Sequence, residues 1–445
     1  MRCADPFLPA LAAAALALLL AGCGGGNSSV TTITGGGLTG GTTVRIDTPT
    51  GPNTTEVVVD SGPASGFSLG AANIPYVTVT VCEPGSATRC ITIDHVFLDT
   101  GSVGLRLLKS KVASLTLQAV SVPADATSAT PAGRALECYP FVLGAVWGPL
   151  ANADLSIAGE SARSLSLQLI DDATPMSDPA PANCIAAANG GLQNSVSSLQ
   201  ANGILGIGMV AYDCGLSCSR GDYASGYTLY YSCPGATGST CSPAALPSAL
   251  QAQNPVAHFA VDNNGTILSL PALPDLGAGV AKGRLVFGIG TQANNQIPPT
   301  AKMIFVDANP ASASYLYFTT TSGTASYADS YIDSGSNALF FDDTVLPKGC
   351  QSSTASASGW YCPRAVVRRT ATVTDAFSTT ASVDYAVANA DVLFASSSIA
   401  FASLAGSAGQ GANTFVWGLP FFYGRSVFTS IWGQALSPNG PWNAF

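Results

Sequence analysis

Residues 97–105 read FLDTGSVGL, and residues 331–339 read YIDSGSNAL. Both stretches place two bulky residues before an aspartate, which is followed by a hydroxyl residue, Gly, Ser, two further residues and Leu. A buried aspartate followed by a glycine turn, present twice, predicts two lobes that bring the carboxylates of Asp99 and Asp333 together. Two carboxylates in close contact cannot both ionise easily, so they share a proton and can act as acid and base at once.

The repeat extends beyond the two aspartates. Residues 204–206 (ILG) follow the first motif, and residues 416–418 (VWG) follow the second. We expect each apolar pair to pack beneath its aspartate turn. The glycine would let the backbone pass close to the turn, because it has no Cβ to clash.

The rest of the chain is strand-like from about residue 76 onward. Residues 76–81 (YVTVTV) and 164–170 (SLSLQLI) alternate apolar and polar positions, as half-buried strands do. The 47 glycines and 28 prolines imply many turns, and a short helix is expected only around 194–201. The pattern therefore predicts an all-β fold with short strands.

The composition excludes several classes of function. Only 10% of residues are charged, the net charge is −9 and the isoelectric point is about 4.6. An acidic surface with few basic residues argues against nucleic acid as a partner. The sequence has no phosphate-binding glycine loop, dinucleotide fingerprint or serine-nucleophile elbow. We therefore expect no cofactor.

The N-terminus has the pattern of a targeting segment. Arg2 supplies a positive charge, residues 8–20 are apolar, and residues 20–23 read LAGC. This run resembles a bacterial lipoprotein box, which predicts a signal peptide over 1–22 and lipid on Cys23. An ordinary secretory signal and a short membrane span are the alternatives, although the apolar run is short for a span.

Acyl chains on Cys23 would hold the protein at a lipid bilayer. Gly24 stands where an inner-membrane retention signal has Asp, so the resemblance favours the outer membrane of a Gram-negative bacterium. Residues 23–70, which begin with Cys23 and are rich in Gly, Ser and Thr, are expected to form a flexible tether.

Ten cysteines follow Cys23, and an even set in an exported chain predicts about five disulfides. Cys82 and Cys90 flank a Pro-Gly turn and are expected to staple a hairpin, and the last two cysteines are expected to close a loop. The pairing between 214 and 241 stays open. With only two histidines, no metal site is expected. The candidates are Cys82, Cys90, Cys138, Cys184, Cys214, Cys218, Cys233, Cys241, Cys350 and Cys362.

Further segments resemble the pepsin-like aspartic proteases, in order, from about residue 76 to 432. Residues 202–208 (NGILGIG) resemble that family's Asp-Gly-Ile-Leu-Gly-Leu segment, and 148–159 resemble the strand that returns from its flap. Residues 285–291 resemble the end of its first lobe, and 415–428 resemble its C-terminal apolar-apolar-Gly segment. The wording DTGSVGLR, the lipoprotein box and LPFFYGRSVF are more similar to a family of proteobacterial lipoproteins.

The resemblance implies a bilobal pepsin-like fold, in which two pseudo-symmetric β lobes surround a cleft. The N-terminal lobe would span 71–305 and include a Cys-rich insertion at 214–241. The C-terminal lobe would span 306–445.

Carried over to this chain, the resemblance makes Asp99 and Asp333 a catalytic dyad that activates water. The hydroxyl residue after each aspartate would bond across the lobes, the serine two residues later would donate to the carboxylate, and the glycines would form the turns. These supporting residues are Thr100, Gly101, Ser102, Ser334, Gly335 and Ser336.

The chain departs from that family at three places. Phe141 stands where the flap tyrosine is usual, Arg106 where a tryptophan bonds that tyrosine, and Leu419 where an aspartate follows the C-terminal glycine. Tyr139 or Trp147 would be the substitutes for the tyrosine. The flap candidates are Phe141, Gly144 and Trp147.

Three functions fit these patterns. The first is a monomeric, lipid-anchored aspartic endopeptidase that cuts polypeptides. The second is a catalytically silent envelope protein that binds peptide or another ligand in the same cleft, and the third is a structural lipoprotein. Hydrogen-bonded carboxyls of Asp99 and Asp333 would favour the first.

Overall fold

The structure is a computed structural model. It describes residues 30–33, 43–46, 51–63, 72–123, 132–187, 191–221, 228–235, 240–308, 316–348, 350, 359–407, 411–434, 436 and 440–445. Nearly all regular structure in them is β, which confirms the all-β prediction. The helices are short: α1 (Ala182–Ala187), α2 (Val196–Leu199), α3 (Leu216–Arg220) and α5 (Ala390–Ala395). Within these ranges, no helix has the length and apolarity needed to span a bilayer.

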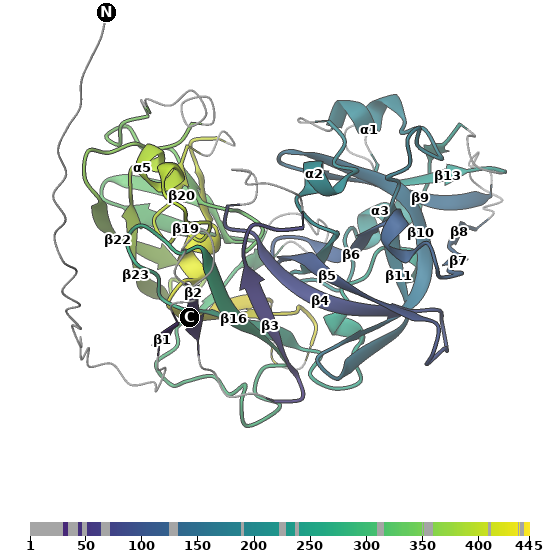
Figure 1. The fold of residues 1–445 in the computed structure, drawn as a ribbon, viewed down its shortest axis with the longest axis horizontal. Coiled ribbons are helices and arrows are strands. Elements are labelled where there is room, and N and C mark those ends of the chain that lie inside the picture. The colour runs from purple at the N-terminus through teal and green to yellow at the C-terminus, as the bar shows by residue number, and fades with distance from the viewer. Residues whose placement is uncertain are drawn as a thin grey trace, which may run out of the picture.

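The N-terminal lobe is built on long antiparallel hairpins (Figure 1). In β4, Val77, Val79 and Val81 are buried and the intervening threonines are more exposed, as the alternating sequence predicts. β10 pairs with β9 and β11, and β4 pairs with β5 and β10. The main strands are β4 (Pro75–Cys82), β5 (Cys90–Asp99), β6 (Val103–Leu108), β9 (Gly133–Phe141), β10 (Gly144–Ile157), β11 (Glu160–Ile170), β12 (Gly203–Ile207) and β13 (Tyr230–Cys233). Three two-residue strands complete this lobe: β7 (Gln118–Ala119), β8 (Ser121–Val122) and β14 (Ser242–Pro243).

The C-terminal lobe has one sheet in the order β23-β22-β19-β20-β25-β21-β24, with β18 beside β19. Its core is aromatic: Phe341 stacks on Phe415 at 4.5 Å between ring centroids, and Phe415 stacks on Trp417 at 4.3 Å. The strands are β18 (Asp307–Ala308), β19 (Leu316–Ser322), β20 (Ala325–Ile332), β21 (Leu339–Phe341), β22 (Val367–Thr374), β23 (Thr380–Val387), β24 (Ala405–Gly406) and β25 (Thr414–Trp417).

A further run of strands connects the two lobes, and Figure 1 shows β3 and β16 between them. β3 pairs with β4 and β16, β16 with β15, β15 with β26, β26 with β27, and β27 with β17. The last strands of the chain therefore complete a sheet that begins in the first half. The bounds are β3 (Thr54–Val59), β15 (Gly265–Leu270), β16 (Val280–Phe287), β17 (Met303–Phe305), β26 (Arg425–Ser430) and β27 (Trp442–Ala444).

The structure differs from the expected tether over 23–70. β3 lies inside that range, and its Val57 and Val59 are fully buried. β1 (Val30–Ile33) and β2 (Thr43–Ile46) also lie there, and β2 pairs with β16. The reason is the valine run of β3, which has an apolar face to bury. The expected signal peptide over 1–22 and Cys23 lie outside the described residues.

Each aspartate turn is crossed by a third strand in the same way. β12 lies between β5 and β6, parallel to the first and antiparallel to the second, with Gly206 opposite Asp99. β25 lies between β20 and β21 with the same two polarities, and the Asp333 N–H donates to the Trp417 carbonyl at 3.0 Å. A Cβ on Gly206 would lie 2.7 Å from the Val103 nitrogen, and one on Gly418 would lie 2.1 Å from the Ala338 oxygen. The predicted packing of the apolar-Gly segments beneath the turns is confirmed.

Five disulfides cross-link the described chain. Cys82–Cys90 and Cys350–Cys362 confirm the two predicted pairs. The open pairing in the insertion is local, Cys214–Cys218 and Cys233–Cys241. Cys138–Cys184 joins β9 to α1 across 46 residues of sequence.

Candidate active site

The two aspartate turns meet at the junction of the lobes and are tied to each other by hydrogen bonds. The Thr100 N–H donates to Ser334 Oγ at 3.1 Å, and the Ser334 N–H donates to Thr100 Oγ1 at 2.9 Å. Ser334 Oγ in turn donates to the Leu98 carbonyl at 2.9 Å. All three residues are buried, so these bonds hold the lobes in one register at the site.

Each carboxylate is also held by its own turn. The Gly101 N–H donates to Asp99 Oδ1 at 2.8 Å, and Ser102 Oγ donates to Asp99 Oδ2 at 2.5 Å. The second turn repeats this arrangement, with the Gly335 N–H 2.7 Å from Asp333 Oδ1 and Ser336 Oγ 2.7 Å from Asp333 Oδ2. The donors fix both carboxyl groups in orientation.

Each turn glycine lies against the aspartate of the opposite lobe. A Cβ on Gly101 would lie 2.6 Å from Asp333 Cγ, and a Cβ on Gly335 would lie 2.5 Å from Asp99 Oδ1. No L side chain fits at either position without moving a carboxylate. The glycines therefore allow the close approach of Asp99 and Asp333.

The surroundings of Asp333 favour its protonated form. Burial, the charge of Asp99 and a hydrogen bond between the two carboxyl groups raise the pKa of Asp333 to about 8. The hydrogen bonds from Ser336 and Gly335 oppose this rise and do not cancel it. Asp333 is partly exposed, and Asp99 is 6% exposed. A pKa of about 8 favours the protonated form of Asp333 near neutral pH, so this carboxyl can donate a proton.

The hairpin of β9 and β10 contains the flap candidates and has two different faces. Phe141 lies beside Tyr139, with ring centroids 5.0 Å apart, on the face toward β6 and β12. Trp147 is fully buried on the other face, against Tyr231, and its Nε1 donates to the Asp178 carbonyl. Gly144 begins β10 with φ +156°, where a Cβ would meet the Gly191 carbonyl at 2.5 Å. Trp147 thus packs the outer layer, and Tyr139 and Phe141 form the inner face.

Arg106 is a buried cation beneath that inner face. Its guanidinium carbon lies 3.8 Å from the centroid of the Tyr139 ring. It forms ion pairs with Glu137 at 2.7 Å and with Asp213 at 3.2 Å, and it is fully buried. Burial raises the pKa of Tyr139, and the nearby charge of Asp99 adds to this rise. A cation–aromatic contact therefore links the hairpin to the strand that follows the Asp99 turn.

Sequence reasoning missed this contact because it looked for a partner at Phe141. Glu137, Tyr139 and Phe141 alternate along β9, so they share one face. An arginine inside the apolar run VGLRLL of β6 requires a buried anion. Those two signals together point to Glu137 and Tyr139.

The hairpin has partners along both of its edges. β13 pairs with β9 over Tyr230–Cys233, and the Gln193 N–H donates to the Ala145 carbonyl of β10 at 2.7 Å. Cys138–Cys184 and a bidentate Arg134–Asp178 pair, with both contacts at 2.8 Å, add further links. The hairpin is therefore fixed in the sheet, apart from its exposed tip at Val142 and Leu143.

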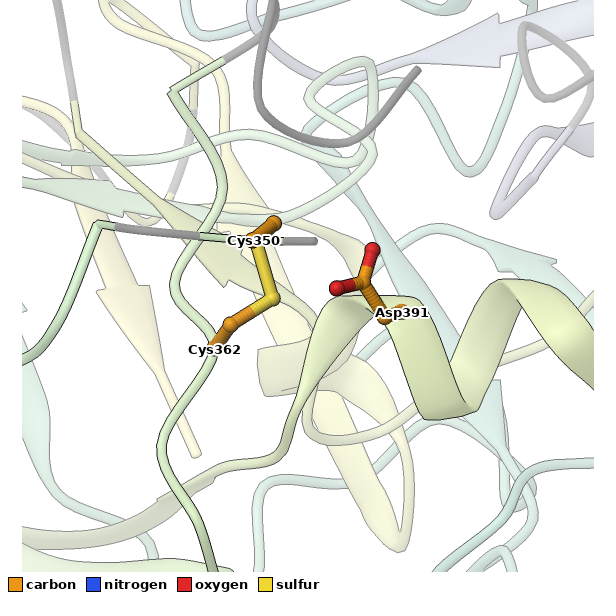
Figure 2. Close-up of side chains that lie close together, drawn as sticks. All are labelled: Cys350, Cys362 and Asp391. Atoms are coloured by element: carbon orange, nitrogen blue, oxygen red, sulfur yellow. A yellow bond between two sulfur atoms is a disulfide. The ribbon is translucent and has the colours of Figure 1, made fainter. Parts of the chain in front are cut away.

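Two other clusters of titratable or metal-ligating side chains lie outside the aspartate turns. His95 contacts Asp94 at 3.0 Å and Asp60 at 3.4 Å. Cys350, Cys362 and Asp391 lie close together (Figure 2). Because the two sulfur atoms of that group are bonded to each other, they have no thiolate to offer a metal ion. Leu419, which stands where an aspartate was expected after the C-terminal glycine, is fully buried, and its N–H donates to the Ser336 carbonyl at 2.7 Å.

The two lobes, each with an aspartate turn crossed by a third strand, form a bilobal pepsin-like aspartic protease fold. Among solved structures, the chain is similar to the aspartic proteinase from Irpex lacteus, with 13% identity and a TM-score of 0.42, over 88% of this chain and 96% of that chain. A search of curated proteins found no match. A family model described as "Protein of unknown function (DUF3443)" matches residues 49–445. The chain belongs to this DUF3443 family.

Proposed function

We propose that the protein is a lipid-anchored aspartic endopeptidase that hydrolyses peptide bonds through Asp99 and Asp333. The observation that carries the proposal is the close approach of the two carboxyl groups: a Cβ on Gly101 would lie 2.6 Å from Asp333 Cγ, and a Cβ on Gly335 would lie 2.5 Å from Asp99 Oδ1. The pKa of Asp333, raised to about 8, supports a proton on this carboxyl at neutral pH. The two cross-lobe hydrogen bonds and the two turn glycines support it, because they hold that pair in place.

The raised pKa of Asp333 supports the following division of roles. The Asp99 carboxylate takes a proton from a water molecule as the water oxygen attacks the peptide carbonyl carbon. Asp333 gives its proton to the carbonyl oxygen, which forms a neutral tetrahedral diol. As the C–N bond breaks, Asp99 returns its proton to the leaving nitrogen and Asp333 recovers the one it gave.

The rest of the proposal concerns the cellular location of the protein and its attachment to a membrane. We propose a signal peptide over 1–22, an acylated Cys23 in the lipid bilayer, and a monomer in the outer membrane of a Gram-negative bacterium. The LAGC run and Gly24 support this location. The five disulfides support an oxidising compartment. The substrate would be a polypeptide in the interlobe cleft.

A second candidate is a catalytically silent binding protein. It is favoured by the β9–β10 hairpin, which has pairing partners along both edges and a disulfide to α1. A hairpin fixed in this way opens less readily to admit a long substrate. In this alternative, the same cleft would hold a peptide or another ligand without cutting it.

Cleavage of a denatured protein mixture tests the proposal. The full chain, with its disulfides intact, is incubated from about pH 3 to pH 7, a range below the raised pKa of Asp333, and new termini are mapped by mass spectrometry. Asp99→Asn and Asp333→Asn should each abolish cleavage. Asp329→Asn, the same change on β20, should not. A folded protein that cuts nothing at any pH would shift the conclusion to the binding alternative.

A further inference from the structure

The C-terminal lobe contains a cavity of about 560 Å³ that is not part of the aspartate site. Its apolar wall includes Trp417, Phe421 and Tyr423, and its polar wall includes Arg368, Arg369 and Arg425. None of its lining residues belongs to the turns at 99–102 and 333–336. Its volume is within the range of small-molecule sites, which is roughly 300–1,000 Å³.

The segment LPFFYGRSVF supplies much of this wall. Pro420, Phe421, Tyr423 and Arg425 all come from it and all line the cavity. The Tyr423 hydroxyl donates to Asn73 Oδ1 at 3.0 Å, so the ring is held in position. The second aspartate turn contacts Gly418, which precedes this segment, and Leu419, its first residue; the cavity gives a role to four of the residues that follow.

Arg425 has an unusual environment for a cation. Its Nη1 donates to the Phe421 carbonyl at 2.7 Å and its Nη2 to the Asp384 carbonyl at 2.8 Å. Its guanidinium carbon lies 4.8 Å from the centroid of the Phe421 ring. Within the described part of the chain, no carboxylate forms an ion pair with it. Burial lowers the pKa of Arg425, and the charge of Asp384 opposes this shift without cancelling it.

The neighbouring arginines are already paired with acids. Arg368 bonds Asp275 at 2.9 Å, and Arg369 bonds Asp343. The carboxylate of Asp384, the acid in the cavity wall, accepts a hydrogen bond from the Thr370 hydroxyl at 2.6 Å. In a protein with a net charge of −9, the wall of this cavity nevertheless has three arginines and one aspartate. Arg425 is the cation that is left for a ligand.

We infer that this cavity binds a small amphiphilic anion, in which a carboxylate or phosphate group is attached to an aromatic or aliphatic body. The anionic group would accept two hydrogen bonds from the guanidinium of Arg425, a geometry that arginine suits better than lysine. The body would pack against Phe421, Tyr423 and Trp417. This inference does not depend on the proposed peptidase activity, because the dyad does not line the cavity.

Isothermal titration of the full chain with matched probes tests the inference. Benzoate has both the anion and the ring, benzamide has the same shape without charge, and acetate has the charge without the ring. Benzoate should bind at least tenfold more tightly than either of the other two. Phenyl phosphate is the fourth probe, and its affinity relative to benzoate identifies the preferred anionic group. Equal binding of benzoate and benzamide, or no saturable binding of any anion, would overturn the inference.

Substitutions locate the binding. Arg425→Gln should weaken benzoate at least tenfold, and Arg425→Lys should weaken it less because the charge remains. Arg163→Gln, the same change at an exposed position of β11, should leave the affinity unchanged. Unchanged affinity in Arg425→Gln would place the anion elsewhere and refute the assignment. If Arg425→Gln does not fold, Arg425→Lys is compared with the unaltered chain instead. Weaker benzoate binding in Arg425→Lys, with benzamide binding unchanged, would support the assignment, and equal benzoate binding in the two proteins would refute it.

Discussion

Removal of the Ser334 hydroxyl should destabilise the protein by about 2–4 kcal/mol. In Ser334→Ala, the Thr100 N–H loses its acceptor and the Leu98 carbonyl loses a donor, at sites where all three residues are at most 5% exposed. Each lost bond contributes about 1 kcal/mol net, and a buried group left unpaired adds to that cost. Two bonds therefore give a loss in the stated range.

Urea unfolding followed by circular dichroism measures this loss. Ser326→Ala is the matched control, because it makes the same change at an exposed position of β20, the strand that leads into the Ser334 turn, and should cost under about 0.5 kcal/mol. Thr100→Val removes the partner bond at 2.9 Å, so the double variant should lose less than the sum of the two single losses. A loss in Ser334→Ala no larger than that of Ser326→Ala would refute the reasoning that these bonds hold the lobes together.

Three more expectations follow from the structure. Arg106→Met leaves Glu137 without its ion pair and should lower the free energy of unfolding by about 3–5 kcal/mol. The double variant Arg106→Met with Glu137→Gln should recover part of this loss, and no recovery in urea unfolding would contradict the pairing. The raised pKa of Asp333, about 8 against roughly 3.9 in the unfolded chain, means that the native state holds an extra proton between these values and loses stability as pH rises through them. The unfolding temperature of Asp333→Asn should therefore fall less than that of the unaltered chain from about pH 4 to pH 8, and parallel curves would argue against the raised pKa. Replacing both Cys138 and Cys184 by Ala opens a 46-residue loop and should lower the free energy of unfolding by about 4 kcal/mol. The same change at Cys82 and Cys90 opens an 8-residue loop and should lower it by about 2.5 kcal/mol. Equal losses in denaturant titrations would count against an effect of loop length.

Much of the candidate site could be predicted from the sequence because its determinants are local. The turn glycines and hydroxyl residues lie within three positions of each aspartate, and the apolar-Gly segments repeat in the same order in both halves. The disulfides with short loops, such as Cys82–Cys90, were predictable for the same reason.

The features that the sequence did not reveal depend on contacts between distant segments. Arg106 meets Glu137, 31 residues away, and Asp213, 107 residues away, and no local pattern joins them. β3 was placed in a tether because glycine-rich sequence precedes it, although its own valines pair with β16, more than 200 residues later. The Trp147 side chain could not be assigned to a face of the hairpin until the register of β9 and β10 was known.

The position of β26 and β27 has a consequence for the order in which the chain is made and folded. β15 has β16 on one edge, and its other edge is filled by Arg425–Ser430, near the C-terminal end of the chain. During synthesis or passage through a translocation channel, that edge stays open until residues 425–430 have emerged, about 155 residues after β15 itself. An open edge strand readily pairs with other chains. A chain cut short before Arg425 would therefore keep this edge of β15 open and be prone to aggregate.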